Sequence, residues 1–297
     1  MPLIYVTGNV NVDLIMGPLA QWPKVGTEIV LPHSETRVGG AAGNTALALE
    51  ALGVPHRLLA SVGDDIFGRW LQSGFGRDAL WRVAPCGTTV SAGIVDPSGE
   101  RTFITSQGHL SVFSLDDALK MLPARAAPGD VLHLQGCFLS PPLLRDYEAW
   151  LDAAVNRGFS LALDTGWPPD GWSAELRQRV IGWLGRCDHL MINEVEVAEL
   201  GRGASLEASI AILRAALRPA ATLVVKRGAA GARGYRGDET ADVAAPQVRV
   251  IDTIGAGDVF DAGYLAGVTA GAGLKAAMAA GVAAASTAIS TSPRRYR

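Results

Sequence analysis

Short apolar runs alternate with longer segments of helical pattern through the second half of the chain. The runs at 131–134, 159–163, 189–192 and 222–225 have the length and the branched apolar residues of buried strands, and a similar run at 3–7 lies near the N-terminus. Strands that alternate with helices are typical of a parallel sheet covered by helices. The pattern therefore predicts an α/β fold.

Two stretches depart from this alternation. Short runs at 90–95 and 101–106 flank the tetrapeptide Asp-Pro-Ser-Gly, a strong turn signal, and therefore predict a β-hairpin. The stretch 264–290 is rich in small residues and almost uncharged, as a membrane span would be. Lys275 and the Gly-Ala-Gly break at 271–273 instead predict two closely packed helices.

Composition narrows the class of protein. With 297 residues, a mass of 31.0 kDa and 48% hydrophobic residues, the chain is long enough for one large α/β domain with a small appendage. The net charge of −3 argues against a nucleic-acid partner, which requires a basic surface. Cys86, Cys137 and Cys187 show no C-x-x-C spacing, and the N-terminal residues resemble a strand rather than a signal peptide. We therefore expect reduced thiols, a cytoplasmic protein and no membrane partner.

The segment 250–261, VIDTIGAGDVFD, carries the strongest chemical signal. Gly255, Ala256 and Gly257 leave little side chain to block the backbone, so successive N–H groups at a helix start are expected to point at one anion. Asp258 follows in the first helical turn. Since a carboxylate repels an anion, its better use is to take a proton from a hydroxyl that attacks a phosphoryl group.

A simpler reading of this segment is a loop that ends in an acidic first-turn residue, which the helix dipole favours. The chain has no G-x-x-x-x-G-K-[ST] motif, which excludes a Walker-type nucleotide site. No G-x-G-x-x-G fingerprint follows the first strand either. Any phosphate site therefore belongs to another kind of loop.

Five segments resemble, in order, those of the ribokinase-like (PfkB) carbohydrate kinase family. The stretch 251–260 is similar to the C-terminal signature of that family. The earlier segments are NVNVDL at 9–14, VGGAAGN at 38–44, NEVE at 193–196 and VKRGAAGARG at 225–234. The resemblance extends over nearly the whole chain.

The resemblance implies a ribokinase-like three-layer α/β fold over residues 1–297, with a mostly parallel central sheet flanked by helices. A small β-sheet lid is expected from about 12–37 and 87–107, where it would exclude water that otherwise accepts the phosphate. In many relatives the lid also forms a dimer interface, so we expect a homodimer. The implied reaction is transfer of the ATP γ-phosphoryl group to an alcohol, usually of a sugar or nucleoside.

The resemblance assigns substrate binding to Asn11, Asp13, Gly39, Gly40 and Asn44. Asn and Asp after a buried strand lie where open α/β sheets bind ligands, and polyols suit charged acceptors, although both residues also favour turns. The glycine pair precedes a helix at 41–53, where a ligand can approach the backbone closely. A flexible turn is the alternative for this pair.

The spacing of Asn193 and Glu196 puts both residues on one helical face just after a buried strand. In the family this pair orders Mg²⁺ and its waters near the phosphates, with Glu196 acting indirectly. Mg²⁺ prefers oxygen ligands and keeps several waters. A helix capping box explains the same spacing equally well.

Further residues are assigned to the nucleotide and to a second cation. Lys226, Gly228 and Gly231, in the turn after the strand 222–225, are candidates for the nucleotide phosphates or adenine. Asp252 resembles the family's ligand for a monovalent cation, usually K⁺, and a turn aspartate is the alternative. Such a cation would steady the anion-binding loop.

The identity of the acceptor stays open. Ribokinases carry a Glu at about the position where this chain has Gly136 and Cys137. The missing Glu disfavours ribose as the substrate. Phe103 and His109 are candidates for stacking on a base, and packing explains each of them equally well. A nucleoside kinase acting on adenosine, inosine or pseudouridine is one alternative. A sugar- or nucleotide-binding regulator without catalysis is another. Asp258 favours the enzyme, because a binding protein needs no proton acceptor.

Overall fold

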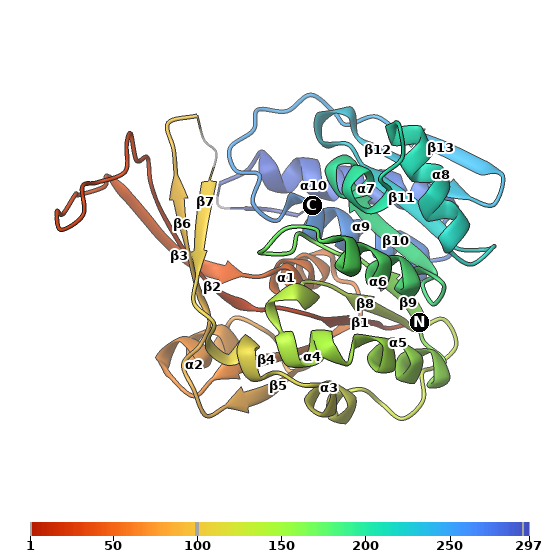
Figure 1. Cartoon of the computed structure of the whole chain (residues 1–297), viewed down its shortest axis with the longest axis horizontal. Coiled ribbons are helices and arrows are strands. Elements are labelled where there is room, and N and C mark those ends of the chain that lie inside the picture. The colour runs from red at the N-terminus through yellow and green to blue at the C-terminus, as the bar shows by residue number, and fades with distance from the viewer. Residues whose placement is uncertain (1, 99–100, 293, 297) are drawn as a thin grey trace.

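The structure is a computed structural model that describes residues 2–98, 101–292 and 294–296 (Figure 1). Within these residues a nine-stranded sheet forms the centre of the molecule. It is parallel from β5 to β11, and β12 and β13 continue it antiparallel. In spatial order the strands are β13 (Glu239–Val243), β12 (Ala232–Arg236), β11 (Thr222–Lys226), β10 (His189–Asn193), β9 (Ser160–Leu163), β8 (Val131–Leu134), β1 (Ile4–Thr7), β4 (His56–Gly63) and β5 (Ala79–Ala84).

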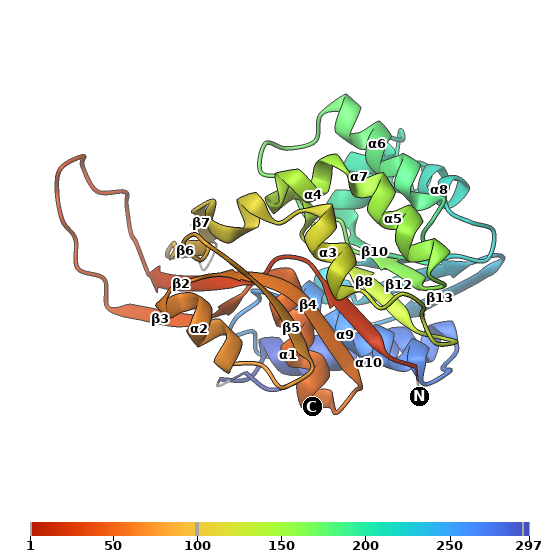
Figure 2. The same cartoon turned by 90° about the horizontal axis from the view of Figure 1, so that it is seen from below.

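Helices cover both faces of this sheet and make the fold three layers thick (Figure 2). Alternate residues of one strand enter different cores: Leu132 packs with one helical layer and Val131 with the other. One layer holds α3 (Leu115–Met121), α4 (Pro141–Arg145), α5 (Tyr147–Asn156), α6 (Ala174–Leu184), α7 (Glu194–Gly201) and α8 (Leu206–Ala216). The other holds α1 (Ala41–Leu52), α2 (Ile66–Ser73), α9 (Ala256–Thr269) and α10 (Leu274–Ile289). The predicted α/β, ribokinase-like fold class is confirmed.

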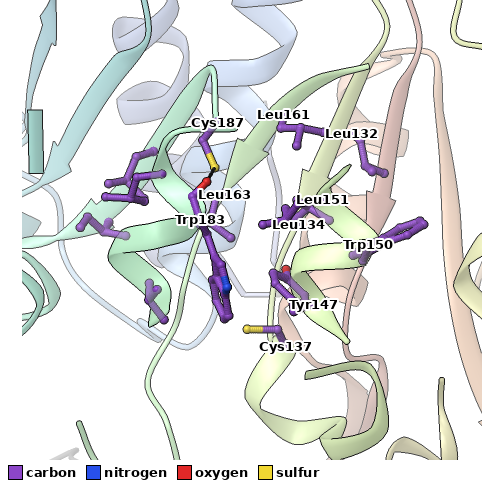
Figure 3. Packing of buried hydrophobic residues seen from close by; sticks show 14 of the residues in the cluster. Leu132, Leu134, Cys137, Tyr147, Trp150, Leu151, Leu161, Leu163, Trp183 and Cys187 are labelled. Carbon is purple, nitrogen blue, oxygen red and sulfur yellow. Dashed lines mark hydrogen bonds between the residues drawn. The ribbon is translucent and has the colours of Figure 1, made fainter. Parts of the chain in front are cut away.

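The core beneath α5 and α6 is closely packed (Figure 3). The rings of Tyr147 and Trp183 lie 4.5 Å apart, and Trp150 is fully buried. Cys137 and Cys187 are buried in the same core, and burial raises the pKa of each thiol to about 12. These thiols stay protonated at neutral pH and act as small apolar side chains.

A second sheet, which we call the lid, lies beside the central sheet (Figure 1). Its strands are β3 (His33–Gly39), β2 (Asn11–Gly17), β6 (Val90–Val95) and β7 (Arg101–Thr105), in that order. β6 and β7 form the predicted hairpin, whereas β2 and β6 pair in parallel. In the predicted turn, Ser98 N–H donates to Asp96 Oδ1 at 2.7 Å, and Gly99 lies outside the described residues.

The C-terminal small-residue stretch forms two helices, as predicted, with the break between α9 and α10 at 270–273. The two helices pack so closely that a Cβ on Gly263 would lie only 2.6 Å from the Ala280 carbonyl oxygen. Among the described residues no helix is long and apolar enough to cross a membrane. The described part of the chain also contains three short 3₁₀ helices, η1 (Gly108–Val112), η2 (Cys137–Leu139) and η3 (Gly228–Ala230).

Candidate active site

The N-terminus of α9 is shaped by a glycine. Gly255 caps the helix with a φ of 70°, a left-handed conformation that favours glycine. A Cβ there would lie 2.7 Å from Asn44 Nδ2, so a side chain would also displace the neighbouring amide. The first-turn N–H groups of a helix have no intrahelical acceptors and carry its positive dipole end. This end of α9 therefore suits an anion.

Asp258 lies in this first turn and is held from α1. Asn44 Nδ2 donates to Asp258 Oδ2 at 2.8 Å, and Thr45 Oγ1 donates to the Asp258 carbonyl oxygen at 3.1 Å. Burial, together with the negative charge of Asp164, raises the pKa of Asp258 to about 7, although the Asn44 hydrogen bond opposes the shift. A carboxylate with this pKa is able to accept a proton near neutral pH.

The residues predicted to bind substrate lie together where β2 begins and β3 ends. Asp13 is 5% exposed, and Asn11 Nδ2 donates to its Oδ1 at 2.7 Å. The Asp13 carboxylate lies directly against Gly39, and a Cβ on Gly39 would collide with this carboxylate. Burial raises the pKa of Asp13 to about 6, and Arg37 opposes this shift. These residues are linked to Asp258 through α1, because Gly40 caps the start of this helix and Asn44 in its first turn donates to Asp258.

The prediction missed a neighbouring polar residue, Asn9. Its Oδ1 accepts from the Ala41 N–H at 3.2 Å, and its Nδ2 donates to Asn11 Oδ1 at 3.3 Å. The same side chain lies against Gly136, where a Cβ would collide with it. Asn9 thus fills the space beside Gly136. Its place in NVNVDL was a usable signal, since it precedes Asn11 by one strand repeat.

The two candidates for stacking on a base differ in the structure. His109 is fully buried, and its Nδ1 accepts from the Thr89 N–H at 2.9 Å. Its side chain therefore packs inside the protein and hydrogen-bonds to the backbone just before β6. Phe103 is 44% exposed on β7.

A cavity of about 650 Å³ lies against the N-terminus of α9, where Ala256 and Gly257 form part of its wall. Lys226, Gly228 and Gly231 line it, as predicted for a nucleotide site, together with Ala256 and Gly257. The rest of its wall is mostly apolar and includes Pro246, Val248, Val250, Phe260, Val282, Ala285 and Ile289. An apolar wall with a helix N-terminus at one end suits a base and a phosphate chain.

Gly231 and Arg227 show how the turn after β11 is built. Gly231 has a φ of 88°, and a Cβ there would collide with the Val243 carbonyl oxygen. The side chain of Arg227 is held by β13, since its Nη2 donates to Asp242 Oδ1 at 2.9 Å. Of the Lys-Arg pair, only Lys226 lines the cavity.

Lys226 belongs to a buried charge network that the sequence did not reveal. Its Nζ lies 2.8 Å from Asp164 Oδ2 and 3.2 Å from Asp261 Oδ1. Burial alone would lower the pKa of Lys226, but these two aspartates raise it, so the amine stays charged. A Cβ on Gly257 would lie 3.4 Å from the same Nζ. The charged amine of Lys226 thus lies beside the turn at the N-terminus of α9, paired with two aspartates.

Asn193 and Glu196 form the capping box of α7. Asn193 Oδ1 accepts from the Glu196 N–H at 2.9 Å, and Glu196 Oε2 accepts from the Asn193 N–H at 2.8 Å. Burial and the Asp164 charge raise the pKa of Glu196 to about 7. Among the described residues no cluster of three His, Cys, Asp or Glu could hold a metal directly. Oxygen donors of this kind fit a hydrated Mg²⁺ held through water.

Asp252 makes contacts of a different kind. Its carboxylate accepts hydrogen bonds from Arg37, Arg101 and Arg294 and from the Ile254 N–H. A cation ligand needs free oxygen lone pairs, whereas these partners are all donors. The expected monovalent cation does not fit this arrangement.

The fold is ribokinase-like, and it brings an acidic residue in the first turn of α9 close to a mostly apolar cavity. Residues 1–294 match the pfkB family carbohydrate kinase, and the chain belongs to this family. It is a carbohydrate kinase.

Similarity to individual proteins agrees with this assignment. The chain is 30% identical over 280 residues to a fructokinase of Klebsiella pneumoniae, covering 89% of this chain and 84% of the relative. Ribokinase from Thermotoga maritima has the same fold, with a TM-score of 0.78 at 20% identity over 98% of this chain and 94% of its own. Arabidopsis thaliana ribokinase complexed with ribose and ATP gives a TM-score of 0.76 at 21% identity, covering 98% and 93%.

Proposed function

We propose that this kinase transfers the γ-phosphoryl group of ATP to a hydroxyl of a small sugar, with Asp258 as general base. The observation that carries the proposal is the position of Asp258 in the first turn of α9, where Asn44 donates a hydrogen bond to it and its pKa is raised to about 7. A base works best when its pKa is close to the operating pH.

The proposed reaction is an in-line displacement. Asp13, Gly40 and Asn44 hold the sugar, and Asp258 takes the proton of its attacking hydroxyl. The N–H groups of Gly255, Ala256 and Gly257, together with the charge of Lys226, stabilise the transferring phosphoryl group. Mg²⁺ organised through water by Asn193 and Glu196 would neutralise charge on the phosphates.

The cavity supports ATP as the donor. Its apolar wall would hold the adenine and its Gly257 end the phosphates. Arabidopsis ribokinase, which shares this fold, was solved with ribose and ATP. We further infer that the protein is cytoplasmic. We also infer a homodimer that pairs through the lid, because Met16 and Ile104 leave large apolar groups exposed there.

The test combines turnover with binding. Purified protein with ATP and Mg²⁺ is assayed for ADP release against neutral sugars, sugar acids and nucleosides, and ATP affinity is measured separately by calorimetry. Activity with a sugar that Asp258→Asn abolishes, without loss of ATP binding, supports the proposal. Activity with nucleosides alone assigns the protein to nucleoside kinases. ATP binding with no turnover of any acceptor supports the non-catalytic regulator.

A further inference from the structure

Three arginines from separate parts of the chain converge on Asp252. Arg37 Nη1 lies 2.5 Å and Arg294 Nη2 3.1 Å from Asp252 Oδ2, and Arg101 Nη2 lies 2.7 Å from Oδ1. The Ile254 N–H also donates to Oδ1, at 2.9 Å. Each carboxylate oxygen therefore accepts two hydrogen bonds.

This group excludes a free cation on chemical grounds. Guanidinium groups stay charged at any working pH and offer only donors. Three of them around one carboxylate leave two formal positive charges, which repel K⁺. The nearby Ile289 carbonyl oxygen is also engaged, since it accepts from the Ile251 N–H at 2.7 Å and the Asp252 N–H at 3.2 Å. Both carboxylate oxygens of Asp252 and the Ile289 carbonyl oxygen are therefore already used as hydrogen-bond acceptors.

The arginines join the lid to the anion-binding loop. Arg37 lies on β3 and Arg101 on β7, the two edge strands of the lid, and Arg294 lies in the segment after α10. Arg101 Nη1 also donates to Thr253 Oγ1 at 3.2 Å. The side chains of all three arginines are less than one-fifth exposed. Asp252 is thus the shared anchor for the lid, the loop before α9 and the C-terminal segment.

We propose that Arg37, Arg101 and Arg294 take the place of a monovalent cation at Asp252, so that phosphoryl transfer proceeds without K⁺. The inference rests on the proposed kinase activity for its kinetic consequence. The three arginines act as positioning residues: they hold the loop that leads to Gly255 and supply fixed positive charge beside it. Their effect passes through the loop and not through contact with the reacting atoms.

The first experiment titrates KCl at constant ionic strength, with tetramethylammonium chloride as the replacement salt. We expect turnover without K⁺ to stay within about twofold of that with K⁺, because the charge belongs to the chain. Saturable activation of the unaltered protein by K⁺ would overturn the inference. ADP release that fails in every salt would count against the proposed function alone.

A binding measurement decides the inference without turnover. Thallium(I), a K⁺ mimic observable by NMR, and thermal unfolding with and without K⁺ are followed on the same protein. No bound thallium signal and no K⁺-dependent rise in Tm are expected. A saturable thallium site that Asp252→Asn removes would contradict the proposal.

Two variants separate positioning from general stability. Arg294→Gln is expected to lower kcat by about tenfold, through a displaced loop, and to gain partial recovery from added K⁺ or guanidinium. Arg101→Gln repeats the test from the lid. Arg295→Gln is the matched control, because Arg295 is exposed next to the cluster. Loss of activity without cation rescue in both cluster variants would leave only a structural role and overturn the proposal.

Discussion

Asp252 and Asp258 belong to the same short signature, yet the structure gives them opposite surroundings. Asp252 contacts three guanidinium groups. Burial would raise its pKa, but the hydrogen bonds from the Ile254 N–H and Arg37 outweigh this effect and lower the pKa. Asp258 has the Asn44 amide as its side-chain hydrogen-bond donor, and burial raises its pKa to about 7. The comparison shows that neighbours, not residue type, decide whether the pKa of a carboxylate is lowered or raised.

The largest expected effect breaks the proton-acceptor half of this comparison. Asp258→Asn should lower kcat by about 10²- to 10⁴-fold, the usual contribution of a general base. ATP affinity should stay nearly unchanged, because the cavity wall is untouched. Single-turnover kinetics and calorimetry measure the two quantities. Near-normal kcat in this variant would remove Asp258 from the mechanism.

The next effect concerns Gly255, which lies against the Asn44 amide that donates to Asp258. Gly255→Ala should cost about 1–2 kcal/mol of stability from left-handed strain, and kcat should fall further than this strain explains because the Cβ pushes Asn44 aside. Gly237→Ala is the control, since Gly237 has a φ of 54° with open space around it and lies in the β12–β13 turn. Equal kcat in both variants would contradict a role for the Asn44 contact.

The pH dependence of the reaction sharpens the comparison. Since Asp258 must be ionised to accept a proton, kcat/KM should fall by about tenfold per pH unit below a midpoint near 7. Asn44 lowers this pKa, so Asn44→Ala should move the midpoint to higher pH. Steady-state profiles between pH 5 and about 9 decide the matter. A flat profile down to pH 5 would mean that another group takes the proton.

The smallest effect on turnover is expected from the last comparison, which is a pair of opposite stability changes. The folded pKa of Asp258 lies above its ordinary value of 3.8, so its stabilising contribution is present below that value and is lost as pH rises through about 7. Asp258→Asn should therefore raise Tm more at pH 8 than at pH 5, where part of the contribution remains. Asp252→Asn should lower stability at pH 8 by about 1–3 kcal/mol, because charged donors lose their partner. Thermal unfolding at both pH values measures the difference. Shifts of the same sign for both variants at pH 8 would contradict the contrast.

Much of the fold was predictable because its signals are local. Buried runs such as β8 and β10, the hairpin of β6 and β7, and the break between α9 and α10 each depend on residues close in sequence. Asn11, Asp13, Gly39 and Gly40 were instead chosen through the family resemblance, and their role in substrate binding stays a prediction. The burial of His109 could not be predicted, because a lone histidine in a polar stretch fits packing and base stacking equally well.

The sequence by itself determined the layered α/β fold, the glycine-bounded turn before α9 and the acidic residue in its first turn. Only the tertiary structure decided what surrounds each carboxylate. Arg37, Arg101 and Arg294 reach Asp252 across 215, 151 and 42 residues, and Lys226 reaches Asp164 across 62. The physical reason is that a pKa depends on charge and burial in space, whereas sequence patterns report mainly on backbone conformation and on which faces are apolar.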